Sequence, residues 1–197
     1  MSTSRLSRFL RASLGKQGGQ VGLLLLACLG LYFFAYRGGR FFLVPSASME
    51  PTLLEGDQIV TLRESVYGRG DVVVLRDPED EKAYIVKRIM AAGGDTILVA
   101  GGAVYVNGSY VSEPYILSTP DYEMRTYSVP EGHVFLLGDN RNNSEDSHLW
   151  KDKARPVNEI IGKVRFIYFP FNRFGFFQGY PPVTPDRDVL EQRPGVL

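Results

Sequence analysis

The polar and apolar positions divide the chain into one long apolar run near its start and a series of short, strand-like segments after it. Residues Val21–Tyr36 (VGLLLLACLGLYFFAY) carry no charge. As a helix, this run would span only about 24 Å, less than the roughly 30 Å hydrocarbon core of a bilayer. Gly18–Gln20 before it and the long side chains of Arg37 and Arg40 after it would supply the missing length. The pattern therefore predicts a transmembrane anchor over residues 21–40.

A cleavable signal peptide is the alternative interpretation of this run, because it too has basic residues before an apolar core. The run is followed by RGGRFF instead of a small-residue cleavage site, which favours a retained anchor. Basic side chains are more frequent before the run than directly after it, which predicts a cytoplasmic N-terminus over residues 1–20. They are Arg5, Arg8, Arg11 and Lys16 before the run, and Arg37 and Arg40 after it.

The region after the anchor alternates between β-branched runs and turn signals. No segment after residue 40 sustains a helical period, so we predict a mainly β, antiparallel, barrel-like domain over residues 41–177. Asn107-Gly108 is a strong hairpin signal. Residues 113–130 are expected to leave the main sheet, and the Pro-rich residues 178–197 to form a loose tail. The expected strands are Gln58–Leu62, Asp71–Leu75, Tyr84–Met90, Thr96–Val99, Ala103–Val106, His133–Leu137 and Ile160–Phe169.

Charge and cysteine content exclude several classes of protein. The 22 basic residues balance the 22 acidic ones, whereas a nucleic-acid-binding protein normally carries a basic excess. Cys28 is the single cysteine, so no disulfide framework can form within the chain. With only His133 and His148 as histidines, the sequence predicts no metal and no cofactor.

Three short clusters carry candidate chemistry. The first is PSASMEPTLLEGD (45–57), the second YIVKRIM (84–90) and the third GDNRNNSEDSH (138–148). The two-residue period of a strand places Ile85, Lys87 and Ile89 on one face, where apolar neighbours would desolvate the lysine and lower its pKa. Taken singly, each cluster also has an ordinary reading: a Ser- and Pro-rich turn, a solvated lysine and a hydrophilic loop.

In this order behind an N-terminal anchor, the blocks PSASMEPTL, GDVVVL, KRIMAAGGD and GDNRNNSEDS resemble type I signal peptidases, which are membrane-bound Ser/Lys endopeptidases. The asparagines of GDNRNNS, and DSH in place of DSR, look most like the cyanobacterial and thylakoid members. The resemblance implies Ser48 as nucleophile, Lys87 as general base, Ser46 as oxyanion-hole donor, Ser144 as the residue that orients the lysine, and Asp139, Arg141 and Asp146 as supporting residues. His148 stands where many members have arginine, which leaves the basic partner of Asp146 open.

The resemblance also implies the substrates and the surroundings. These are signal peptides of exported preproteins with small residues at positions −3 and −1, a lipid bilayer, and a position close to the secretion translocon. The expected membrane is the cell inner (plasma) membrane or the thylakoid membrane, with the catalytic domain on the periplasmic or lumenal side. Shallow apolar pockets are expected from residues that flank the motifs, although ordinary core packing explains them equally well: Phe42, Val44, Pro45, Met49, Leu53 and Val86.

Three other readings stay open. A Ser-His-Asp hydrolase would pair Ser48 with His133 or His148, but the sequence lacks GxSxG. A catalytically inactive, anchored β-domain would bind partner proteins, yet it would be expected to lack Ser48 or Lys87. A membrane-anchored Ser/Lys processing protease of another kind is the third alternative.

Overall fold

The computed structural model describes residues 20–32, 34–80 and 82–177. The predicted tail (178–197), and the predicted basic N-terminus (1–20) apart from Gln20, lie outside the described residues. The chain divides into two compact units between Gly38 and Gly39, and each is described by itself.

The first unit is helical over residues 20–32 and 34–36, and most of its side chains are exposed. Within the described part of the chain, no helix combines the length and the apolar character needed to cross a membrane.

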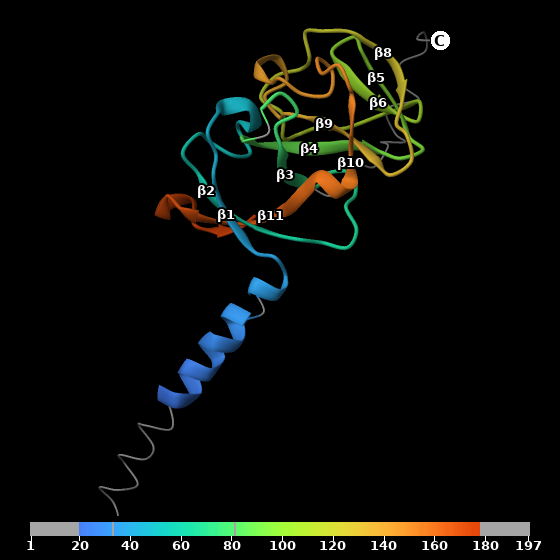
Figure 1. The fold of residues 1–197 in the computed structure, drawn as a ribbon. Coiled ribbons are helices and arrows are strands. Elements are labelled where there is room, and N and C mark those ends of the chain that lie inside the picture. Colours follow the sequence, from blue (N-terminus) through green and yellow to red (C-terminus); the bar gives the residue numbers. More distant parts are fainter. Residues whose placement is uncertain (1–19, 33, 81, 178–197) are drawn as a thin grey trace, which may run out of the picture. The chain divides into compact units, whose positions relative to one another are not determined.

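The second unit consists of antiparallel strands joined by turns (Figure 1). Its strands are β1 (Arg40–Leu43), β2 (Gln58–Leu62), β3 (Val72–Arg76), β4 (Tyr84–Ala92), β5 (Thr96–Ala100), β6 (Ala103–Val106), β7 (Ser109–Tyr110), β8 (Met124–Ser128), β9 (His133–Leu137), β10 (Ala154–Pro156), β11 (Ile160–Phe169) and β12 (Gly175–Phe176). Short 3₁₀ turns lie between them: η1 (Ala47–Met49), η2 (Arg141–Asn143), η3 (Val157–Glu159) and η4 (Phe171–Arg173).

The strands form two sheets. The larger has the order β1-β2-β11-β3-β4-β9-β10, with β12 paired to β11, and the smaller has the order β7-β6-β5-β8. Figure 1 shows β5, β6 and β8 grouped at one end of this unit, and β1 and β11 at the other. The prediction of a mainly β, antiparallel fold is confirmed.

Strand positions agree closely with the sequence pattern. The bounds of β2, β6, β9 and β11 are those expected, and β4 continues two residues further, to Ala92. The region predicted to leave the main sheet contains β8, which pairs with β5 in the smaller sheet. The pattern did not predict β1, β8, β10 or β12, because short strands without alternating burial resemble loops in sequence.

The Asn107-Gly108 hairpin is confirmed. Both residues have positive φ, at 54° and 75°, and they connect the cross-strand pair Val106 and Ser109. Two consecutive left-handed residues are what a two-residue hairpin with matching strand twist requires.

Strand β4 is buried on both faces, and this places charged side chains inside the protein. Residues 86–91 are all buried. Lys87 pairs across the sheet with Val73, whose face packs with Ile89 and Trp150, as the strand period predicted. The next residue, Arg88, points to the opposite face. Two consecutive basic side chains are therefore buried on opposite sides of one central strand.

Candidate active site

Lys87 is buried beside the apolar side chains on its face of β4 and forms a hydrogen bond with Ser144. Its side chain is buried, the residue being only 3% exposed, and its Nζ donates a hydrogen bond to Ser144 Oγ at 2.9 Å. Burial lowers the pKa of Lys87 below its ordinary value, while the carboxylates of Asp146 and Asp77 oppose this shift. Desolvation disfavours the ammonium form, so the neutral amine that a general base requires becomes accessible nearer neutral pH.

Ser48 lies in the turn η1. The next residue, Met49, is fully buried, and its carbonyl accepts a hydrogen bond from the backbone N–H of Leu53 at 3.0 Å. Ser46 Oγ lies 3.4 Å from Ser48 Oγ and is hydrogen-bonded to it. The buried methionine therefore anchors a turn that keeps Ser48 half-buried and Ser46 exposed.

The loop after β9 is fastened to this turn. The backbone N–H of Asn140 donates to the carbonyl of Ser48 at 3.1 Å, and its side-chain amide donates to the carbonyl of Ala47 at 3.1 Å. A Cβ atom on Gly138 would lie 2.2 Å from Ser144 Oγ and 2.4 Å from the Ser48 carbonyl oxygen. Only glycine fits between these groups. The roles of Gly138 and Asn140 were not predicted from the sequence, although both residues belong to the GDNRNNS block.

One cavity of about 280 Å³ brings the predicted chemical groups together. It is lined by Ser46, Ala47, Ser48, Asp77, Glu79, Ile85, Lys87, Asn143, Glu145 and Trp150. A hydroxyl, a desolvated amine and a second hydroxyl thus face one space, as acyl transfer requires.

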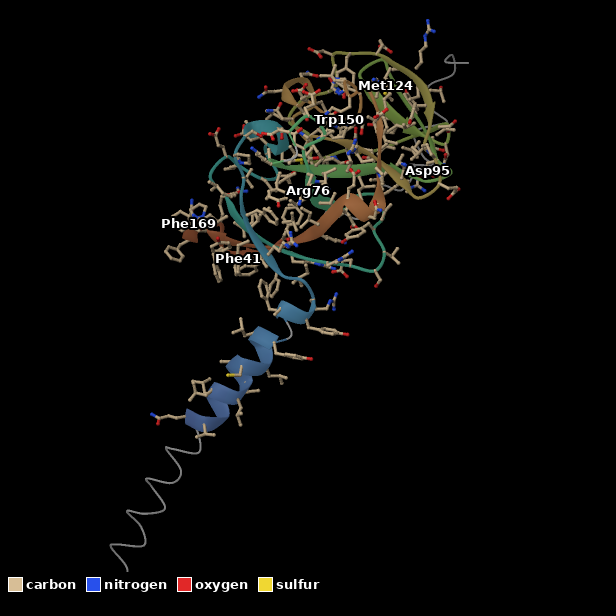
Figure 2. The ribbon with its side chains drawn as sticks, viewed as in Figure 1. Phe41, Arg76, Asp95, Met124, Trp150 and Phe169 are labelled. Atoms are coloured by element: carbon tan, nitrogen blue, oxygen red, sulfur yellow. The ribbon has the colours of Figure 1, made fainter. Side chains whose placement is uncertain are left out.

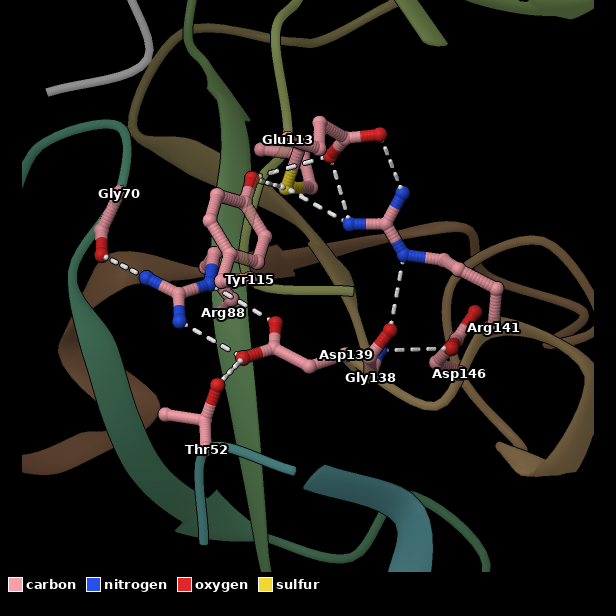
Figure 3. A network of polar contacts seen from close by, with 10 residues as sticks. Thr52, Gly70, Arg88, Glu113, Tyr115, Gly138, Asp139, Arg141 and Asp146 are labelled. Carbon is pink, nitrogen blue, oxygen red and sulfur yellow. Dashed lines mark hydrogen bonds and ion pairs between the residues drawn. The ribbon is translucent and has the colours of Figure 1, made fainter. Parts of the chain in front are cut away.

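Asp139 is the partner of Arg88 in a fully buried ion pair (Figure 3). Arg88 Nε donates to Asp139 Oδ1 at 2.8 Å, and Nη2 donates to Oδ2 at 2.7 Å. Thr52 Oγ1 also donates to this carboxylate, and Arg88 Nη1 donates to the Gly70 carbonyl at 2.8 Å. This bidentate pair ties the loop after β9 to β4 and to the segment that follows η1.

Arg141 forms a second bidentate pair, with Glu113 (Figure 3). Its Nη1 and Nη2 donate to the Glu113 carboxylate at 2.8 and 2.7 Å, and its Nε donates to the Gly138 carbonyl at 2.9 Å. Tyr115 donates its hydroxyl proton to Glu113 at 2.9 Å, and its ring lies 4.0 Å from the Arg88 guanidinium. Glu113 and Tyr115 were not predicted from the sequence, because they lie outside the recognised blocks.

The basic partner of Asp146 is His148. Its Oδ2 accepts a hydrogen bond from the Gly138 N–H at 2.9 Å, and its Oδ1 lies 2.5 Å from His148 Nδ1. The question that the DSH sequence left open is thereby answered, because His148 contacts Asp146 directly. His133 lies elsewhere, with Nδ1 2.9 Å from the Glu131 carbonyl oxygen, and neither histidine lines the cavity beside Ser48.

The six residues suggested for apolar substrate pockets lie mostly in the core. Val44, Met49, Leu53 and Val86 are buried in one cluster, and Phe42 packs against it half-buried. Pro45 is exposed. A substrate-binding role for these residues stays a prediction. Among the described residues, no group of three or more His, Cys, Asp or Glu side chains is arranged to hold a metal ion.

Comparison with known proteins gives a match to one protein family. Residues 18–169 match the family described as signal peptidase, peptidase S26. The chain belongs to the S26 signal peptidase family. That match includes every residue of the cavity and both buried ion pairs.

Relatives within the S26 family come from cyanobacteria and from a plant. The chain is 40% identical over 178 residues to the probable signal peptidase I-1 of Synechocystis, which covers 85% of this chain and 87% of that protein. It is 37% identical over 174 residues to the signal peptidase I of Leptolyngbya laminosa, covering 82% of both chains. It is also 41% identical over 157 residues to the probable thylakoidal processing peptidase 2 of Arabidopsis thaliana, covering 74% of this chain and 42% of that protein. The resemblance to cyanobacterial and thylakoid members is confirmed.

Proposed function

We propose that the chain acts as a signal peptidase I in which Ser48 is the nucleophile and Lys87 the general base. The neutral Lys87 amine takes the proton of Ser48 Oγ, and Oγ attacks the scissile carbonyl carbon. Lys87 then gives this proton to the departing amine, which leaves an ester between Ser48 and the signal peptide. The Lys87 amine, neutral again, next takes a proton from a water molecule, which hydrolyses the ester and frees Ser48.

The observation that carries this proposal is the environment of the Lys87 Nζ. It is buried, hydrogen-bonded to Ser144 Oγ at 2.9 Å, and lines the same cavity as Ser48. A lysine amine has no tautomer to fix, so one hydroxyl can orient it. In this scheme, the Ser48 backbone N–H and the Ser46 hydroxyl stabilise the oxyanion, while the buried pairs of Asp139, Arg141 and Asp146 support the loop that holds Ser144.

The proposed substrates are exported preproteins with small residues at −3 and −1. The names of the cyanobacterial relatives support this class, since they are signal peptidases.

We also propose that residues 21–40 anchor the protein in the plasma or thylakoid membrane, with residues 1–20 cytoplasmic, residues 41–177 forming the protease domain and 178–197 a loose tail. The uncharged run Val21–Tyr36 supports an anchor. So does a set of large exposed apolar side chains on β1, at the end of β11 and in the segment that follows it: Phe41, Leu43, Phe169, Phe171, Phe174 and Phe176. Figure 2 labels Phe41 and Phe169 at one end of the β unit. Such a surface near the bilayer and the translocon would meet a signal peptide that is still in the membrane.

Cleavage of a preprotein by the full chain in detergent tests the proposal. We expect the wild type to release the signal peptide and Ser48→Ala to be inactive while folded. Ser65→Ala, a change at an exposed serine outside the cavity, is the matched control and should cleave normally. A folded wild type without activity would favour an inactive, partner-binding domain, and an active Ser48→Ala would exclude this nucleophile.

A further inference from the structure

The imidazole ring of His148 lies face to face with the phenol ring of Tyr122. Their centroids are 3.9 Å apart, and their planes differ by 9°. Tyr122 precedes β8 and packs against the core cluster that includes residues of the smaller sheet. On the other side of the chain, Lys153 Nζ donates to the His148 carbonyl at 2.6 Å. Both the ring and the backbone of His148 are therefore held by residues from other segments.

The edge of the His148 ring contacts a carboxylate that reaches the proposed active site. Nδ1 lies 2.5 Å from Asp146 Oδ1, and the Asp146 side chain is fully buried. The other oxygen of Asp146 accepts the Gly138 N–H. Gly138 in turn packs so closely against Ser144 Oγ and the Ser48 carbonyl oxygen that a Cβ atom would not fit between them. A continuous series of contacts therefore runs from Tyr122 to the residue that orients Lys87.

We propose that the Tyr122–His148 stack is a positioning device for the active site. The Tyr122 ring fixes the imidazole, the imidazole fixes Asp146, and Asp146 holds the Gly138 turn against Ser144. The inference rests on the function proposed above for Ser48 and Lys87. Tyr122 and His148 do not line the cavity, so both act through other residues.

Tyr122 acts on His148 through its ring and not through a hydrogen bond of its hydroxyl group. Its oxygen is buried and has no hydrogen-bond partner among the described residues. The ring face, and not the hydroxyl, therefore makes the contact. Tyr122→Phe should preserve the device, whereas Tyr122→Leu should remove it.

The Tyr122–His148 stack should also affect the pKa of Lys87. Burial lowers the pKa of Lys87, and Asp146 opposes this shift more than any other carboxylate, ahead of Asp77, Glu145 and Asp139. A hydrogen bond from His148 spreads the negative charge of Asp146, so its loss should strengthen that opposition and raise the pKa of Lys87. The charged residues that act on the neighbouring Tyr122 hydroxyl are Asp146, Arg141, Glu113 and Asp121. None of them changes in the variants below.

The test measures kcat and KM for preprotein cleavage against pH, with the full chain in detergent. The variants are Tyr122→Phe, Tyr122→Leu, His148→Asn and the double change Tyr122→Leu/His148→Asn. Asparagine has a donor of similar reach, but without the ring that stacks on Tyr122 nothing holds this donor against Asp146. We expect Tyr122→Leu and His148→Asn each to lower kcat about tenfold, the size of coupling between contacting residues, with KM little changed. Their acid limbs should move to higher pH, and the double variant should be no worse than either single one.

Tyr105→Leu is the structural control, because it breaks another aromatic pair, Tyr105 and Tyr110, in the smaller sheet. It should change the melting temperature without moving the acid limb. A folded Tyr122→Leu with wild-type kinetics would overturn the inference, and so would equal losses in Tyr122→Phe and Tyr122→Leu. If Tyr122→Leu does not fold, His148→Asn takes its place, and a folded His148→Asn with wild-type kcat and an unmoved acid limb would overturn the inference. Failure of the wild type to cleave, or cleavage by Ser48→Ala, would instead overturn the proposed function.

Discussion

Lys87 and Ser144 are 57 positions apart in sequence, yet the lysine Nζ donates a buried hydrogen bond to the serine Oγ at 2.9 Å. Gly138 packs directly against the Ser144 Oγ, since a Cβ atom on this glycine would lie only 2.2 Å from it. The hydrogen bond explains how a flexible lysine side chain can be held in one orientation within an apolar site.

Lys87→Met should abolish cleavage while the protein stays folded. Methionine keeps much of the length and apolar character of the lysine stem, and removing a neutral amine leaves no buried charge behind. Cleavage of a preprotein, together with thermal unfolding, checks this expectation. Lys151→Met, at an exposed lysine, serves as the control. His133→Ala should retain full activity, and His148→Ala should keep about a tenth of it, the loss expected when a positioning contact is removed. A His148→Ala enzyme that is folded but wholly inactive would point to a histidine mechanism.

The pH profile of kcat/KM should rise through an ionisation well below the value of about 10.4 for a free lysine. Burial lowers the pKa of Lys87, and the active form is the deprotonated amine, so activity is lost as pH falls through that pKa. Asp77→Asn removes a charge that raises this pKa, and the limb should therefore move to lower pH. Asp152→Asn, at an exposed position outside the cavity, should leave the limb in place. An acid limb that does not move in Asp77→Asn would show that the Asp77 charge does not act on Lys87.

Ser46→Ala should slow the chemical step with little effect on binding. Loss of one oxyanion-hole donor costs about 2.7–4 kcal/mol in the barrier, because the donor acts on charge that develops only in the transition state. Steady-state kinetics separate the two effects, with a lower kcat and a nearly constant KM expected. An unchanged kcat with a raised KM would make Ser46 a binding or turn residue.

Gly138→Ala should disable the site through packing alone. The added methyl group would lie 2.4 Å from the Ser48 carbonyl oxygen, which belongs to backbone and cannot rotate away. We expect cleavage to fall to background and stability to drop by about 1–3 kcal/mol, as for other overpacked positions. Gly68→Ala is the matched control, because a Cβ there meets nothing within 4 Å. Wild-type kinetics in Gly138→Ala would mean that the loop adjusts freely.

The proposed topology can be checked in sealed inside-out vesicles, where the cytoplasmic face is outside. Added protease should trim only the basic N-terminus and leave the domain from residue 41 onward whole. Detergent-opened vesicles provide the control in which that domain becomes accessible. Digestion of the domain in sealed vesicles would contradict the cytoplasmic placement of residues 1–20.

The local sequence pattern was sufficient to predict that Lys87 lies on the same side of its strand as Ile85 and Ile89, and that Asn107-Gly108 forms a hairpin turn. Both depend on rules that act over a few residues, namely the two-residue strand period and the left-handed turn. Glu113 and Tyr115 could not be predicted in this way. Their contacts with Arg141 and Arg88 exist only because the segment before β8 packs against the loop after β9, a relation between distant parts of the chain.

The pairing of Asp146 with His148 illustrates the same limit. The resemblance to signal peptidases identified both residues, but the stack that holds the imidazole involves Tyr122, which lies in none of the recognised blocks. The burial of Met49 and Leu53 was equally hidden, because a turn contains no periodicity from which an inward face can be predicted.

The position of β11 has a consequence for how the enzyme matures during synthesis. In the larger sheet this strand lies between β2 and β3, so the hairpin that brackets Ser48 and the hairpin that carries Lys87 are joined edge to edge through it. A ribosome delivers Ser48 and Lys87 long before it delivers Ile160–Phe169. Until then, the sheet has a gap between the two halves of the site, and long-range strand pairings of this kind form slowly. A nascent chain would thus carry both reactive side chains without the ability to cut, and proteolytic competence would arrive only once β11 has paired with β2 and β3.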